Sequence, residues 1–164
     1  MRLNSDGSRD TSFSPGPTNF GGLAPVFAMQ IQSDGQLVVG GEFATVDSVA
    51  VGNIARLNTN GSLDTSFTAG TGANGNVYGI ATQPDQKLIV TGEFTQFAGQ
   101  QYASLVRLGS NGTVDSSFAP SGIALGAQAN RAAVQPNGKI VVVGNFESYL
   151  GSPNGIAQFN PNGS

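Results

Sequence analysis

The chain of 164 residues has no cysteine, no histidine and no tryptophan, and only 10% of its residues are charged. Without cysteine it has no disulfides, no thiolate catalysis and no zinc site of the usual kind. Without histidine it lacks the commonest general base and metal ligand near neutral pH. The net charge of -3 argues against nucleic acid as a partner, because a nucleic-acid groove needs clustered lysine and arginine. No apolar run approaches the ~20 residues that span a bilayer, so we expect no membrane insertion.

What the sequence does contain is an internal repeat. Residues 2–13 read RLNSDGSRDTSF, residues 56–67 read RLNTNGSLDTSF, residues 107–118 read RLGSNGTVDSSF, and residues 158–164, QFNPNGS, begin a fourth copy. Successive copies start 54, 51 and 51 residues apart. A period of about 50 residues indicates a solenoid, a propeller or another repeat array.

A second element recurs at the same spacing, at residues 32–43, 83–94 and 135–146. Each copy holds a tight turn and then an apolar run such as LVVGG, and each is preceded by another apolar run, VFAMQIQ, VYGIATQ or ANRAAVQ. This pattern predicts a hairpin of two strands, which we name A and B. Strand B is apolar on both faces, so we expect it to be the central strand of a sheet.

The remaining part of each repeat, NIARLN or SLVRLG followed by LDTSF or VDSSF, predicts a second hairpin of strands C and D. The chain is therefore expected to be all-β, with three four-stranded antiparallel blades of about 51 residues, as in a β-propeller. Residues 1–164 would form a single repeat domain in a larger propeller or assembly. Its parts would be residues 1–13, strands C and D of a preceding blade; 14–67, repeat 1; 68–118, repeat 2; and 119–164, repeat 3, which lacks strand D.

The motif RLN-x-(D/N)GS-x-DTSF, followed by Q-P-(D/N)-G-K-(I/L)-(V/I)-V-x-G-x-F, resembles the delta-60 repeat. This is a bacterial β-propeller repeat family of unassigned function, found mostly in large secreted or surface proteins. The resemblance covers nearly the whole chain and implies an extracellular or cell-surface location. It supplies no catalytic residues. Gln86 stands where the family has a turn glycine, and Gly109 stands at the motif asparagine.

Most charged residues recur with the repeat, which favours a scaffold role: arginine pairing with a carboxylate across strands, and aspartate capping a turn. We therefore predict no catalytic residue, no cofactor and no metal. The turn at Asn58 to Asp64 could also be read as the start of a calcium loop, but it has too few carboxylates. A third reading is glycosylation, because three Asn-Gly-Ser/Thr sequons fall on the expected turns. The three sequon asparagines are Asn60, Asn111 and Asn162.

The long connections between strands B and C and between strands D and A differ among the repeats, whereas the A–B and C–D turns are alike. In an up-and-down blade these two sets of connections lie on opposite faces, so recognition is expected on the face of the long loops. The candidates for ligand or partner binding are Phe20, Asp47, Phe97, Gln100, Tyr102, Glu147 and Tyr149. The alternative is that the aromatic rings cover their own loops.

The sequence thus predicts a non-enzymatic scaffold that assembles, or that binds protein or glycan, at the cell surface or outside the cell. The alternative is a carbohydrate-active hydrolase or lyase propeller, for which only Asp47 and Glu147 lie in the long loops. Three blades leave two blade faces uncovered, and the chain starts and stops at strand C. The partners expected are therefore further copies of the chain, or further repeats of a longer one.

Overall fold

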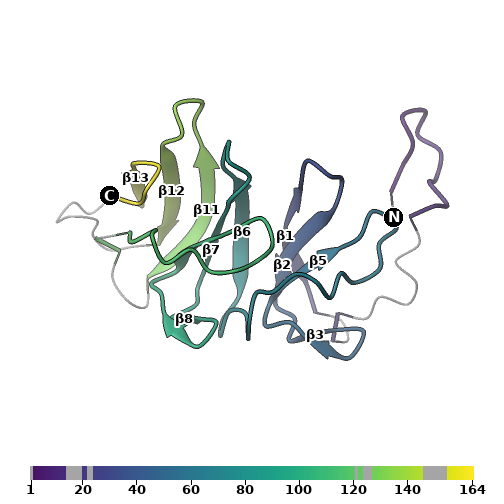
Figure 1. Cartoon of the computed structure of the whole chain (residues 1–164), viewed down its shortest axis with the longest axis horizontal. Helices are drawn as coiled ribbons and strands as arrows, with labels where there is room; N and C mark the ends of the chain where they lie inside the picture. Colours follow the sequence, from purple (N-terminus) through teal and green to yellow (C-terminus); the bar gives the residue numbers. More distant parts are fainter. Residues whose placement is uncertain (1, 14–19, 22–23, 121, 124–126, 146–154) are drawn as a thin grey trace.

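The structure is a computed structural model that describes residues 2–13, 20–21, 24–120, 122–123, 127–145 and 155–164. The described residues form strands, turns and loops and contain no helix. Three antiparallel three-stranded sheets stand side by side, with the termini at opposite ends of the row (Figure 1). The prediction of an all-β fold built from repeated antiparallel sheets is confirmed.

Each sheet is one repeat, and its strands follow one another in space as they do along the chain. Sheet 1 holds β1 (Val26–Ile31), β2 (Leu37–Gly41) and β5 (Ile54–Leu57). Sheet 2 holds β6 (Val77–Thr82), β7 (Leu88–Gly92) and β10 (Leu105–Leu108). Sheet 3 holds β11 (Gln128–Val134), β12 (Ile140–Asn145) and β13 (Ile156–Phe159).

The segments predicted to form strand D make much less β-structure than expected. The segment LDTSF contributes one antiparallel pairing, of Leu63 with Leu57, and VDSSF contributes one, of Val114 with Leu108. The three named sheets therefore have three strands each rather than four. The physical reason is that Asp64 and Asp115 turn the chain by bonding to the serine two residues later, which ends the ladder.

The B–C connections of repeats 1 and 2 form small hairpins instead of the irregular loops expected. In repeat 1 the connection forms a small hairpin of β3 (Thr45–Val46) and β4 (Val49–Ala50). In repeat 2 it forms the equivalent hairpin of β8 (Gln96–Phe97) and β9 (Gln100–Gln101). These hairpins lie beside the D–A connections, since Ala73 pairs with Phe97 and the Ala73 N–H donates to the carbonyl of Gly52.

The A–B turns keep one geometry although their sequences differ. In each turn the N–H of the third residue after glutamine donates to that glutamine's carbonyl, at 3.0 Å for Gly35, 2.9 Å for Gln86 and 2.8 Å for Gly138. All three donors have a positive φ, of 83°, 67° and 81°. Gln86 thus preserves the turn in a backbone conformation that favours glycine.

The core forms between repeats as much as within them. One buried cluster joins Val38 and Ile54 of repeat 1 to the central strands of repeat 2, and another joins Leu105 of repeat 2 to repeat 3. β7 is buried along its whole length, as predicted for a central strand with layers on both sides. A Cβ atom at Gly40 of β2 would clash with the side chain of Val77 of β6, so the close packing of these two repeats requires glycine at this position.

Candidate functional site

The most regular polar feature is a set of four side chains that recurs in the C–D hairpin, here named the arginine cluster. In repeat 2 the Arg107 Nε donates to Oδ2 of Asp115 at 3.0 Å, and its guanidinium carbon lies 4.8 Å from the centre of the Phe118 ring. The Arg107 Nη2 also donates to the Ser117 hydroxyl. The same contacts recur around the other two arginines, with partners Arg56, Asp64, Ser66 and Phe67, and Arg2, Asp10, Ser12 and Phe13.

Each arginine also reaches the next repeat. Arg2 donates to the carbonyl of Thr59 at 2.8 Å, Arg56 to that of Ser110 at 2.9 Å and Arg107 to that of Pro161 at 2.7 Å. These three carbonyls occupy equivalent positions in successive C–D turns. The arginine cluster therefore links each repeat to the next by hydrogen bonds. This is the scaffold role that the periodicity of the charges predicted.

Hydrogen bonds set the charge state of the aspartates in these clusters. At Asp64, burial raises the pKa. The Ser66 hydroxyl and backbone N–H and the Arg56 guanidinium together lower it by more, so that the net pKa is about 2. At Asp115 the Ser117 hydroxyl is the largest influence, and with Lys87 and Arg107 it holds the pKa well below its usual range. The Ser12 hydroxyl and the Arg2 guanidinium likewise lower the pKa of Asp10 to about 2. All three aspartates are therefore ionised at neutral pH, and their oxygens are occupied as hydrogen-bond acceptors.

Two hollows on the face of the short turns also repeat. One lies between repeats 1 and 2 and is lined by residues that include Gln32, Asp34, Arg56 and Asn111. The other lies between repeats 2 and 3 at the equivalent positions, with Gln83, Asp85, Arg107 and Asn162. Gln32 and Gln83 donate across these hollows to the same carbonyls that accept from the arginines. Both hollows are lined by equivalent residues of the repeat, so we interpret them as part of the contact between repeats that the arginine cluster makes.

The aromatic residues predicted to form a binding surface are largely structural. Phe97 is fully buried, and its ring packs edge-on against Phe94 with centroids 5.8 Å apart, so in this structure the ring is not exposed. Phe20 is half-buried against Phe43 at 5.0 Å. Tyr102 is half-buried beside the core cluster. The alternative interpretation, that these rings cover their own loops, describes all three.

The polar candidates are divided between described and undescribed residues. Asp47 lies exposed at the tip of the β3–β4 hairpin with φ of 50°, and Gln100 lies exposed in β9. Glu147 and Tyr149 lie outside the described residues. Within the described part of the chain, no three carboxylate side chains gather as a metal site would require.

The three sequon asparagines lie exposed on turns, as expected. Each side-chain oxygen accepts the backbone N–H two residues later, at 3.0 Å for Asn60, 3.2 Å for Asn111 and 3.1 Å for Asn162. The same oxygens accept the hydroxyls of Ser62, Thr113 and Ser164. These contacts are those of a turn stabilised by asparagine.

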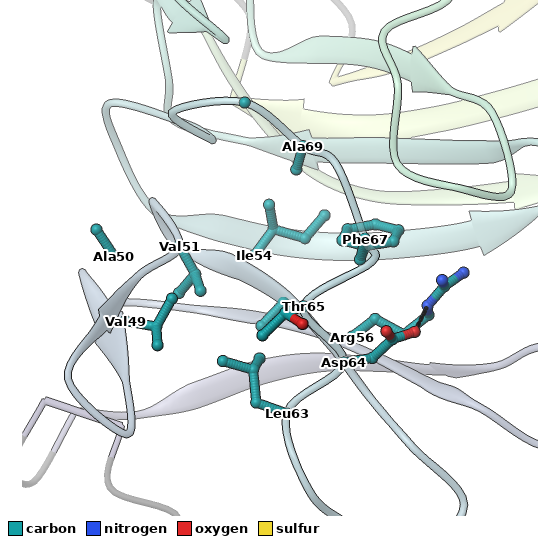
Figure 2. A pocket seen from close by; sticks show the side chains of 12 residues that line it. Val49, Ala50, Val51, Ile54, Arg56, Leu63, Asp64, Thr65, Phe67 and Ala69 are labelled. Atoms are coloured by element: carbon teal, nitrogen blue, oxygen red, sulfur yellow. Dashed lines mark hydrogen bonds and ion pairs between the residues drawn. The ribbon is translucent and has the colours of Figure 1, made fainter.

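One pocket was not found by sequence reasoning. It lies between the β3–β4 hairpin, β5 and the segment 63–70, with a volume of about 140 Å³. Figure 2 shows Val51, Ile54 and Leu63 on one side of the pocket and Arg56 with Asp64 at the other end. The signal in the sequence was a difference in size, because valine at position 51 aligns with tyrosine at position 102.

Among the described residues, no helix has the length and apolar character that crossing a membrane requires. Comparison with curated proteins found no match. The sequence does match a family described as "Domain of unknown function (DUF5122) beta-propeller" over residues 1–13, 32–67, 83–118 and 135–164. These segments are most of the chain. They include both repeated sequence elements but not strand A of each repeat. The chain therefore belongs to the DUF5122 beta-propeller family.

Proposed function

We propose that the chain is a non-enzymatic scaffold of delta-60 type whose two end repeats dock onto further repeats of the same kind. These repeats can be supplied by other copies or by a longer polypeptide, at the cell surface or outside the cell. The observation that carries the proposal is that side chains buried between repeats at internal positions are exposed at the two ends of the row. The open ends therefore match each other chemically.

The first of these ends is the leading face, formed by Val26 and Met29 of β1. In repeat 2 the equivalent residues are Val77 and Ile80 of β6, and their side chains lie against Gly40 of the preceding repeat. Val77 is fully buried there. On the leading face no described residue covers them in this way, and Met29 is 63% exposed.

The second end is the trailing face, formed by Val143 of β12 and Ile156 of β13. Ile156 is equivalent to Ile54 and Leu105, which the following repeat buries almost completely. On the trailing face Ile156 is 57% exposed, and Val143, the counterpart of Gly40, is also exposed. A leading face docked here would bury Ile156 as the two internal interfaces bury Ile54 and Leu105. The packing at Val143 must differ from that at Gly40, where Val77 fills the space of a Cβ atom.

Sedimentation of the chain at micromolar concentration tests the proposal. We expect species heavier than one chain of 16.7 kDa, and we expect either M29E or I156E to reduce them to single chains. The matched control is Q100E, a charge placed on an exposed hairpin away from both faces. A folded wild-type chain that sediments only as a monomer would contradict association between copies.

Mixing the two variants makes the test more specific. M29E keeps an intact trailing face and I156E keeps an intact leading face, so an equimolar mixture should form a pair of chains through one normal interface. Neither variant should do so alone. If the mixture stays monomeric while the wild type associates, the copies associate through a different surface.

A second candidate function is binding of protein or glycan on the face of the long loops. It is favoured by the exposed amide side chains of Gln100 and Gln101 in β9, which have no equivalent in the aliphatic β4 hairpin strand of repeat 1. Titration of the chain with glycan arrays or candidate proteins, compared with a Q100A/Q101A variant, tests it. Loss of a saturable signal in the variant would support this face.

A further inference from the structure

We propose that the pocket beside the β3–β4 hairpin in repeat 1 binds one phenol ring, with the ring in the aliphatic part and its hydroxyl toward Asp64. This inference does not depend on the proposed assembly, because none of the residues that line the pocket belongs to the leading or trailing face. The argument rests on a comparison of the same place in repeats 1 and 2.

The backbone holds position 51 of repeat 1 and position 102 of repeat 2 in the same way. The Val51 N–H donates to the carbonyl of Ala44 at 2.9 Å, and the Tyr102 N–H donates to the equivalent carbonyl of Thr95 at 3.0 Å. Two residues later, Asn53 and Ser104 both have positive φ, of 66° and 61°. The two side chains therefore leave equivalent backbone positions in the same direction.

Tyr102 shows what the space can hold. In repeat 2, Tyr102 and Val114 are both partly buried against the core cluster that includes Val106 and Leu108. Burial and the nearby negative charge of Asp115 raise the pKa of its hydroxyl. In repeat 2 this space is thus occupied by a phenol ring that lies half-buried against the core cluster.

In repeat 1 the walls of this space are present but valine does not fill it. The floor consists of buried Ile54, Ala55 and Ala69, while Val51 and Leu63 are half-buried at the sides. The opening is at exposed residues, including Val49 and Gly70. The charged end is the Arg56–Asp64 pair (Figure 2). Its equivalent in repeat 2 is the Arg107–Asp115 pair.

The size of the pocket fits a single ring. Its volume is about 140 Å³, and an apolar protein cavity of about 150 Å³ is known to bind benzene. The Arg56–Asp64 end of the pocket is polar, so a phenol, which places its hydroxyl there, matches the lining better than a benzene ring alone. A ligand of about eight non-hydrogen atoms is expected to bind with a dissociation constant on the order of 1 mM.

The test is a titration of the full chain with p-cresol, which is the tyrosine side chain as a free molecule, followed by methyl NMR. We expect saturable shifts at Val51, Ile54 and Leu63. V51Y, which copies repeat 2, should fill the pocket and weaken binding at least tenfold, while Q100Y, a tyrosine on the equivalent exposed hairpin, should bind as the wild type does. Y102V should open a second site and double the stoichiometry.

The outcomes separate clearly. Absence of saturable shifts in the wild type, or unchanged binding by V51Y shown to be folded by its dispersed spectrum, would overturn the proposal. Toluene binding as tightly as p-cresol would overturn the assignment of a hydroxyl at Asp64. Tighter binding of N-acetyltyrosinamide than of p-cresol would support a tyrosyl side chain of a partner as the source of the ring. The opposite order would support a free phenol.

Discussion

Ile54 and Ile156 occupy the same position in repeats 1 and 3, yet Ile54 is buried and Ile156 is exposed. The difference is the neighbour: repeat 2 packs over Ile54, while no described residue packs over Ile156 in the same way. Stability in repeat proteins is approximately a sum of the repeats and their interfaces with nearest neighbours. The comparison teaches that part of the core of a repeat is buried only when the next repeat packs against it.

The arginine clusters show the same contrast in polar groups. The Arg2–Asp10, Arg56–Asp64 and Arg107–Asp115 pairs have closest distances of 2.7, 2.7 and 3.0 Å, so the local bonding is alike. However, the Arg2 side chain is 42% exposed and that of Arg107 only 7%. The hairpin builds the ion pair by itself, and the flanking repeats determine how deeply it is buried.

The largest expected effect comes from truncating the two isoleucines. I54A removes a buried side chain from the cluster shared by repeats 1 and 2 and should lower the free energy of unfolding by about 2–5 kcal/mol. I156A changes an exposed side chain, so its effect in the single chain should stay within about 0.5 kcal/mol. Urea denaturation at concentrations where the chain is monomeric measures both. Equal losses would refute the contrast between internal and end positions.

Acidification should produce an intermediate effect through the aspartates of the clusters. The pKa of Asp64 is lowered to about 2, below the value of about 3.9 expected in the unfolded chain. Its contribution to stability is therefore complete above about pH 4 and is lost as the pH falls toward 2, because the unfolded chain binds the proton more readily.

The matched variant is D64N, which cannot ionise. It should be less stable than the wild type at pH 7, and the gap should narrow as the pH falls from about 4 to 2. Urea midpoints measured across that interval test this. A gap that stays constant would mean that the ionised form of Asp64 is not the one that stabilises the fold.

The smallest effect is expected at the A–B turns. Gln86 has φ of 67° where Gly35 has 83°, and a left-handed conformation costs a side-chain-bearing residue roughly 1–2 kcal/mol. Part of the gain from glycine is offset by its greater freedom in the unfolded chain. Q86G should therefore stabilise by roughly 0.5 kcal/mol, and G35Q should destabilise by a similar amount. The thermal midpoints of both variants measure it, and shifts of the same sign would contradict the explanation.

Much of the scaffold was predictable because each repeat has its own local chemistry. The turn at Asn58 to Asp64 is closed by its own side chains, so three copies of the motif predicted three copies of the turn. Strand D was not predictable to the same degree. LDTSF has the composition of a short strand, but the Asp64 carboxylate caps a turn within it and stops the pairing after Leu63.

The candidate site was harder to predict from the sequence. Aromatic residues in the variable loops suggested a binding surface. However, Phe97 lies in the short hairpin strand β8, which pairs with β9, and its ring packs against Phe94 in the core. The pocket beside Val51 exists because the valine side chain is smaller than the tyrosine at the equivalent position of repeat 2. A sequence motif does not show such a difference in filled space. Only the alignment of valine with tyrosine at equivalent positions pointed to it.

The sequence by itself determined the all-β class, the period, the central B strands, the positions of the turns and the arginine–aspartate pairing. All of these follow from interactions between residues close together in one repeat. The tertiary structure alone decided which copy of each residue is buried and where a pocket remains. Those properties depend on which repeat packs against which, and on small differences in side-chain volume between copies that share one backbone.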